Sequence, residues 1–120
     1  MRGAEVTLRF LPPSRGGRVA TPGFQGAWYR PHLRVGATGE YLGVVFLIGP
    51  EQVPPDTEIE ATVALIYDVD YSPLQPGIEF EVLEGPRLVA TGRVNRRFED
   101  DRDWHTFAIP RPNKRLDPSA

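Results

Sequence analysis

The chain contains no cysteine among its 120 residues. Disulfides, thiolate nucleophiles and cysteine-based zinc sites are therefore excluded. The absence of cysteine also fits a reducing compartment. The first residues, Met1 to Val6, lack the apolar segment of a secretory signal. Together these features lead us to expect a cytoplasmic protein.

Long apolar runs and a strong charge of one sign are also missing. The longest apolar run extends from Leu42 to Ile48, with Gly43 inside it, and is too short to span a membrane. The net charge is −2, Lys114 is the only lysine, and the sequence pI is about 5.7. A strongly basic nucleic-acid binder would show a marked positive balance. We therefore expect neither a membrane partner nor tight binding to nucleic acid.

Catalytic patterns are scarce. None of the serines stands in a Gly-x-Ser-x-Gly context, which argues against a hydrolase nucleophile. The carboxylate pairs Glu58/Glu60 and Glu79/Glu81 are spaced for one strand face, but a solvated polar face explains them better than catalysis. We expect no enzyme, with an enzyme of unknown type as the residual alternative.

Metal and nucleotide sites are equally poorly supported. His105 lies close to the acidic segment 99–103, but this segment lacks the central glycine and terminal glutamate of a calcium loop. Gly16-Gly17-Arg18 is not followed by the Gly-Lys-Ser/Thr that holds a nucleotide phosphate. The sequence therefore predicts no cofactor, no metal and no bound nucleotide.

Proline and glycine are abundant and divide the chain into short pieces. Thirteen prolines and twelve glycines leave few stretches for a helix of normal length. Residues 5–10 and 57–67 alternate between apolar and polar side chains, as half-buried strands do. Residues 78–82 and 88–98 flank the tight turn Glu84-Gly85-Pro86-Arg87. Residues 41–48 are apolar on both faces, which suggests a strand covered on both sides.

This pattern predicts an all-β fold, a small closed antiparallel β-barrel of about six strands. We assign residues 1–98 to a single barrel domain. Residues 99–120 form an acidic segment and a C-terminal tail. For this segment we expect one added strand or an apolar clasp, followed by a disordered end.

Five short phrases stand in order along the chain. They are Gly16-Gly17-Arg18, Tyr29-Arg30-Pro31-His32, Pro76-Gly77-Ile78-Glu79-Phe80, Glu84-Gly85-Pro86-Arg87 and Thr91-Gly92-Arg93-Val94. In this order and spacing they resemble the C-terminal β-barrel domain of the elongation factor Tu class of translation GTPases. The resemblance covers most of residues 4–97, without the GTPase domain and the second barrel of that class.

The resemblance implies candidate contact residues. In that class the domain packs against the GTPase domain and helps to hold the T-stem backbone of aminoacyl-tRNA. Arg30 matches the arginine of the family's Tyr-Arg-Pro segment, and Glu84 and Gly85 match the turn that approaches the tRNA backbone. Leu83 stands where the family usually has arginine, which removes a phosphate partner. Pro86 replaces a glycine, which removes a backbone N–H.

Two functions compete. The first is a non-enzymatic protein-interaction module linked to translation, a partner, decoy or immunity protein that binds a translation GTPase or a toxin. The alternative is a weak tRNA- or RNA-binding accessory that uses Arg30, Arg34 and Arg93. Arg30 and Gly85 also have structural interpretations, as an internal partner of a carboxylate or carbonyl and as a turn residue.

Overall fold

The computed structural model describes residues 1–18, 20 and 23–109. The strands are β1 (Arg2–Phe10), β2 (His32–Arg34), β3 (Leu42–Gly43), β4 (Val45–Ile48), β5 (Ile59–Ala64), β6 (Glu79–Glu84) and β7 (Arg87–Glu99). Two 3₁₀-helices accompany them, η1 (Pro13–Arg15) and η2 (Trp104–Phe107). No α-helix occurs among the described residues, and the predicted all-β class is confirmed.

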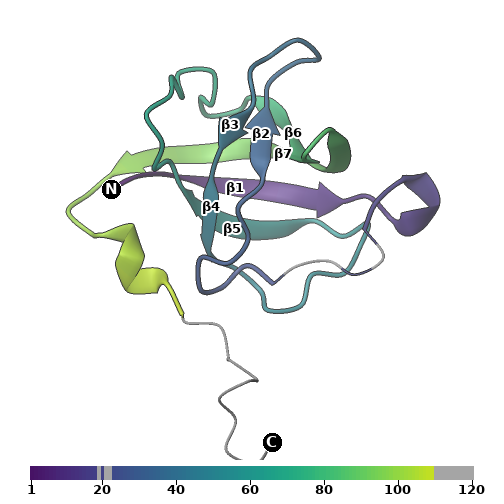
Figure 1. The fold of residues 1–120 in the computed structure, drawn as a ribbon, viewed down its shortest axis with the longest axis horizontal. Coiled ribbons are helices and arrows are strands. Elements are labelled where there is room, and N and C mark those ends of the chain that lie inside the picture. Colours follow the sequence, from purple (N-terminus) through teal and green to yellow (C-terminus); the bar gives the residue numbers. More distant parts are fainter. Residues whose placement is uncertain (19, 21–22, 110–120) are drawn as a thin grey trace, which may run out of the picture.

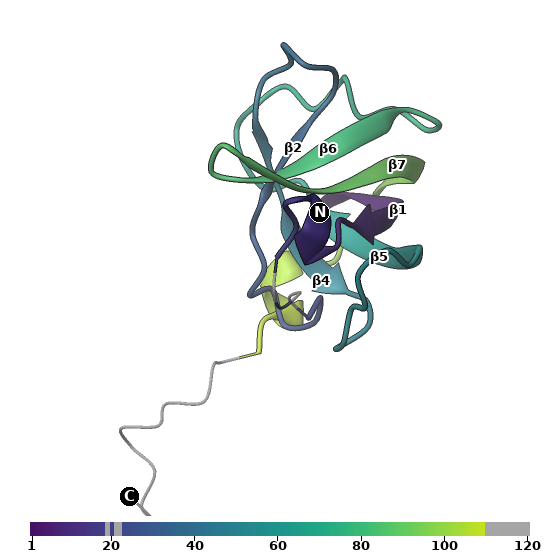
Figure 2. The same ribbon diagram turned by 90° about the vertical axis from the view of Figure 1, so that its right-hand side faces the viewer.

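All seven strands belong to one antiparallel sheet, in the order β3-β2-β6-β7-β1-β5-β4. The sheet curls into a half-barrel, which is visible when Figures 1 and 2 are compared. The prediction of a closed barrel is therefore wrong, and the strand number of about six is one too low.

The reason lies at the two edges of the sheet. The edge strands β3 and β4 are separated only by Val44. The Val44 N–H donates to the Pro31 carbonyl at 3.1 Å, and the Phe46 N–H donates to the Tyr29 carbonyl at 3.0 Å. Pro31 has no N–H to donate in return. The two hydrogen bonds therefore join β4 to the segment that precedes β2, without forming the continuous ladder that closure requires.

The inside of the half-barrel holds the main hydrophobic core. Val6, Leu8 and Phe10 alternate along β1 and are each at most 1% exposed. The ring of Phe24 lies 4.5 Å from that of Phe46 and 5.8 Å from that of Phe10, measured between centroids. Burying each of these side chains stabilises the fold by roughly 1.5–3 kcal/mol. The alternation predicted for residues 5–10 is confirmed.

A β-bulge changes the facing of side chains along β7. The β1–β7 register shifts between Glu5 and Val6, which leaves Asn95 without a residue opposite. The Asn95 side-chain amide donates instead to Thr7 Oγ1 at 2.8 Å. Because a bulge inserts one residue, Arg96 returns to the outer face of the sheet and pairs with Glu5.

Strand β4 is covered on both faces, as its apolar sequence predicts. Phe46 belongs to the main core. Val45 and Leu47 are buried in a second cluster, against which Trp104 and Phe107 of η2 pack. Figure 1 shows η2 beside β4 at the end of the coloured chain.

Residues 100–109 form an apolar clasp rather than an added strand. The Asp103 carboxylate accepts from the His105 N–H at 3.0 Å and caps η2. The Trp28 indole N–H donates to the Ile109 carbonyl, which fixes the end of the clasp. The predicted disordered end falls at 110–120, outside the described residues.

Candidate interaction surface

Two of the phrases, seventy residues apart, meet in space. The Arg87 guanidinium donates to the Gly16 carbonyl at 3.1 Å and to the Gly17 carbonyl at 2.6 Å. Gly16 has a φ of +87°, a conformation that glycine adopts readily. The Gly-Gly-Arg loop and the Glu-Gly-Pro-Arg turn therefore support one another as structural elements.

Glu84 is engaged within the fold. It accepts a 2.7 Å hydrogen bond from the Tyr29 hydroxyl and lies 3.4 Å from the Arg18 guanidinium. Burial, and then the Glu84 carboxylate, raise the pKa of Tyr29 above its usual range. The next residue, Gly85, has a φ of +57° and precedes Pro86, an arrangement that fits a type II′ hairpin turn.

Arg30 also makes internal contacts. Its Nε donates to the Ala27 carbonyl at 3.0 Å, and its guanidinium lies 5.3 Å from the Trp104 ring centroid. These contacts join the loop before β2 to the clasp. Leu83, which precedes Glu84 in β6, is buried.

Arg34 and Arg93 lie on the outer face of the sheet, and each is paired with a carboxylate. Arg34 donates through Nε and Nη2 to Glu81 Oε1 at 3.2 and 2.8 Å. Arg93 Nη1 donates to Glu58 Oε1 at 3.1 Å. The five candidate residues thus fall in three places: the β6–β7 turn, the loop before β2 and the outer face.

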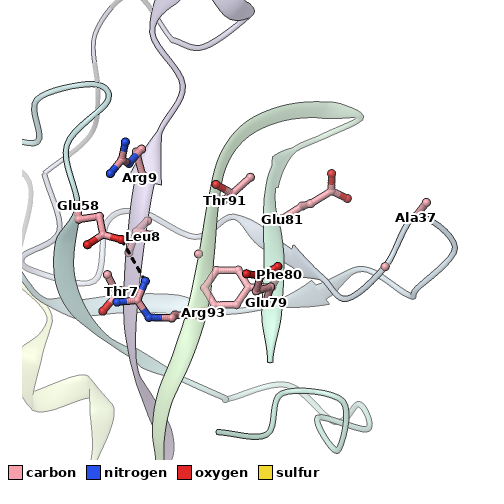
Figure 3. Close-up of a pocket in the computed structure, with 12 residues that line it drawn as sticks. Thr7, Leu8, Arg9, Ala37, Glu58, Glu79, Phe80, Glu81, Thr91 and Arg93 are labelled. Atoms are coloured by element: carbon pink, nitrogen blue, oxygen red, sulfur yellow. Dashed lines mark hydrogen bonds and ion pairs between the residues drawn. The ribbon is translucent and has the colours of Figure 1, made fainter. Parts of the chain in front are cut away.

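A groove of about 610 Å³ opens on the outer face, and we call it the outer groove (Figure 3). It is lined by Thr7, Leu8, Arg9, Gly36, Ala37, Glu58, Glu79, Phe80, Glu81, Thr91, Gly92 and Arg93. In Figure 3 Arg93 of β7 reaches across β1 toward Glu58, while Glu79 and Glu81 project from β6.

The outer groove carries charges of both signs. Arg9 lies 3.6 Å from Asp56, and Arg93 pairs with Glu58, so both arginines already have carboxylate partners. Glu79 is exposed and makes no ion pair within the described part of the chain. The groove therefore lacks the uncompensated positive charge that a phosphate backbone attracts.

Sequence reasoning did not predict the outer groove. Strands β6 and β7 form a hairpin, in which Arg93 lies opposite Glu79, but β1 is far from both in the chain. Only the β1–β7 register places Thr7 beside Arg93. The available signal was the polar face of each strand, which the sequence alone assigns to solvent.

Metal-ligating side chains do not gather in groups of three or more among residues 1–18, 20 and 23–109. In the same part of the chain, no helix has the length and apolar character needed to cross a membrane. No protein-family model matches the chain. The functional interpretation therefore rests on the surface described above.

Proposed function

We propose that this chain is a non-enzymatic protein-interaction module that binds a partner protein through the outer groove. The observation that carries the proposal is the mixed charge of that groove. The groove is lined by Arg9 and Arg93, each held by a carboxylate, and by Glu79, a carboxylate with no ion pair in the described part of the chain. Alternating charges of this kind select partners by electrostatic complementarity.

A protein partner fits this surface better than RNA. Phosphate contacts need lysines or arginines whose charge is available, and affinity depends on how many phosphates are neutralised. Arg34 and Arg93 are each paired with a glutamate, so a phosphate would have to compete with that carboxylate. Arg30 donates a hydrogen bond to the Ala27 carbonyl, and its guanidinium lies over the Trp104 ring. RNA binding remains the weaker alternative.

The resemblance to the elongation factor Tu C-terminal barrel belongs to the same proposal. The contacts of Arg87 with Gly16 and Gly17 support it, because they give the matching phrases a common structural role. In that class the barrel is a docking partner of other protein domains. A translation GTPase, or a toxin that recognises such a barrel, is the corresponding partner here.

The test compares variants in a capture experiment. The tagged full chain is immobilised and exposed to an extract of the cells that naturally express it. We expect a stoichiometric partner that Glu79→Arg captures at least tenfold less well. Glu51→Arg is the matched control, because Glu51 is exposed and outside the groove. Capture of no partner, or equal capture by Glu79→Arg, contradicts the proposal.

The RNA alternative is measured separately, by fluorescence anisotropy of labelled tRNA at low salt. We expect no saturable binding. Saturable binding that Arg34→Ala and Arg93→Ala each weaken would favour the RNA-binding accessory instead. The Arg93–Glu58 pair is exposed enough that its loss costs the fold about 0–1 kcal/mol.

A further inference from the structure

Three aromatic side chains lie side by side at the β2–β3 edge, outside the outer groove. Tyr41 and Tyr67 are 42% and 43% exposed. His32 lies beside Tyr41, with ring centroids 5.7 Å apart, and it pairs across the strands with Gly43. The Tyr67 ring covers Gly43, where a Cβ would meet Tyr67 Cε2 at 2.8 Å. We call His32, Tyr41 and Tyr67 the aromatic strip.

The loop after β5 is fastened against this edge. The Tyr71 hydroxyl donates to the Gly43 carbonyl at 2.7 Å and accepts from the Tyr67 N–H at 3.2 Å. Arg97 Nη1 donates to the carbonyls of Tyr71 and Leu74 at 3.2 and 3.1 Å. The aromatic strip is therefore preorganised, which lowers the entropy that a ligand must remove on binding.

Three exposed carboxylates, Glu40, Asp68 and Asp70, border the aromatic strip, and we call them the acidic rim. None of them makes an ion pair within the described part of the chain. Glu40 and Asp70 line one cleft of about 310 Å³. The Ser72 N–H donates to Asp70 at 2.9 Å, which lowers the pKa of Asp70 and keeps it charged.

Two arginines lie close by but do not neutralise the negative charge of the acidic rim. Arg34 lies 5.7 Å from the Tyr41 ring centroid, and Glu81 neutralises it at 2.8 Å. Arg2 donates to the Tyr67 carbonyl at 3.2 Å and lies over the Tyr71 ring. The surface around the aromatic strip therefore keeps an excess of negative charge beside exposed aromatic faces.

We propose that the aromatic strip and the acidic rim bind a basic, arginine- or lysine-containing segment of a partner protein. Exposed tyrosine faces attract guanidinium and ammonium groups through the ring quadrupole. The rim carboxylates supply the opposite charge to neighbouring basic side chains, and tyrosines are enriched among the residues that dominate protein interfaces. None of these residues lines the outer groove, so this inference stands or fails separately from the proposed function.

The experiment titrates the full ¹⁵N-labelled chain with a nine-residue peptide of alternating arginine and glycine. We expect saturable shifts of the amides of residues 40–43 and 67–70. A peptide with citrulline in place of arginine keeps the shape and removes the charge, and we expect it to bind at least tenfold more weakly. A glutamate–glycine peptide should not bind.

Matched variants locate the site. Glu40→Lys and Asp68→Lys should each weaken the arginine peptide at least fivefold, and Tyr41→Ser should do the same without changing charge. Asp101→Lys is the control, because Asp101 is exposed and belongs to the clasp segment. The spectrum of each variant reports whether it has kept its fold, so a loss of affinity can be assigned to the surface.

Three outcomes would overturn the inference. The first is equal binding of the arginine and citrulline peptides. The second is an affinity within twofold of the original in both folded charge-reversal variants. The third is self-association through these residues, detected by sedimentation at the concentration of the titration, which would make a second copy of this chain the occupant.

Discussion

The Tyr29 hydroxyl donates a 2.7 Å hydrogen bond to a carboxylate oxygen of Glu84. The same ring stacks on Phe24 at a centroid distance of 5.9 Å and lies 5.3 Å from Phe46. The bond therefore connects the aromatic core to the β6–β7 turn. It also joins the Tyr-Arg-Pro phrase to the Glu-Gly phrase, which gives both a structural role.

Removing this hydrogen bond should destabilise the fold. Tyr29→Phe leaves the Glu84 carboxylate without its phenolic donor, and a hydrogen bond to a charged group contributes about 1.5–3 kcal/mol. We expect the free energy of unfolding in urea to fall by about that amount. Tyr41→Phe is the control, since Tyr41 is exposed. Equal stability of Tyr29→Phe and the original chain would contradict the assignment.

Alkaline pH should destabilise the chain through the same residue. Burial and Glu84 raise the pKa of Tyr29 in the folded state above that of an unfolded tyrosine. The unfolded state therefore releases this proton first, and the stabilisation present below about pH 10 is lost as pH rises, with a slope of up to about 1.4 kcal/mol per pH unit. Urea unfolding between pH 9 and 11 should show that the free energy of unfolding falls less steeply with pH in Tyr29→Phe than in the original chain. Tyr71, whose pKa burial also raises, accounts for part of the dependence that remains. The same pH dependence in both chains would contradict this role of Tyr29.

The strands could be predicted from the sequence because their alternation is strong. Val6, Leu8 and Phe10 face the core as their period of two requires. The two-sided burial of β4 was also predictable, because Val45 and Leu47 leave no polar face. The open edge could not be predicted, because it depends on the Pro31 carbonyl accepting a hydrogen bond from Val44, thirteen residues later in the chain.

The candidate contact residues show where sequence reasoning stops. Arg30 and Glu84 were identified by their phrases, but their internal partners, Trp104 and Tyr29, lie 74 and 55 positions away in the chain. The bulge at Asn95, which decides which β7 side chains face outward, leaves no distinct local pattern. The aromatic strip depends on the β2–β3 pairing together with a loop that follows β5.

Gly92 should not tolerate a side chain. A Cβ there would meet the Thr7 carbonyl oxygen at 2.6 Å and the Phe80 ring at 2.8 Å. Overpacking of this kind typically costs about 1–3 kcal/mol, so we expect Gly92→Ala to lower the free energy of unfolding by that amount. Thr91→Ala, at the exposed neighbouring position, should change it by no more than about 0.5 kcal/mol. Equal effects of the two substitutions would argue against this packing.

The Glu5–Arg96 pair should change the pKa of Glu5 clearly and the free energy of unfolding only slightly. Hydrogen bonding to Arg96 lowers the pKa of Glu5, but both side chains are largely exposed. Because the Glu5 pKa is lowered in the folded state, the pair stabilises the fold at pH values above the usual pKa of glutamate. This stabilisation is lost as the pH falls through the folded-state pKa of Glu5. In Arg96→Gln, NMR titration should show the Glu5 pKa rising, while the free energy of unfolding at neutral pH should change little, because an exposed ion pair contributes little to stability. An unmoved Glu5 pKa would contradict the pairing.

The clasp should shield β4 from water and slow the hydrogen exchange of its amides. Phe107 packs on the cluster that contains Val45 and Leu47, so Phe107→Ala exposes these side chains to water. For a partly buried aromatic ring we expect a loss of about 1–2 kcal/mol. Hydrogen exchange of the β4 amides should accelerate more than that of the β1 amides, because β1 lies between two strands of the sheet. Asp101→Ala, on the exposed part of the same segment, is the control. Unchanged exchange of β4 in Phe107→Ala would show that the clasp lies on the sheet without stabilising it.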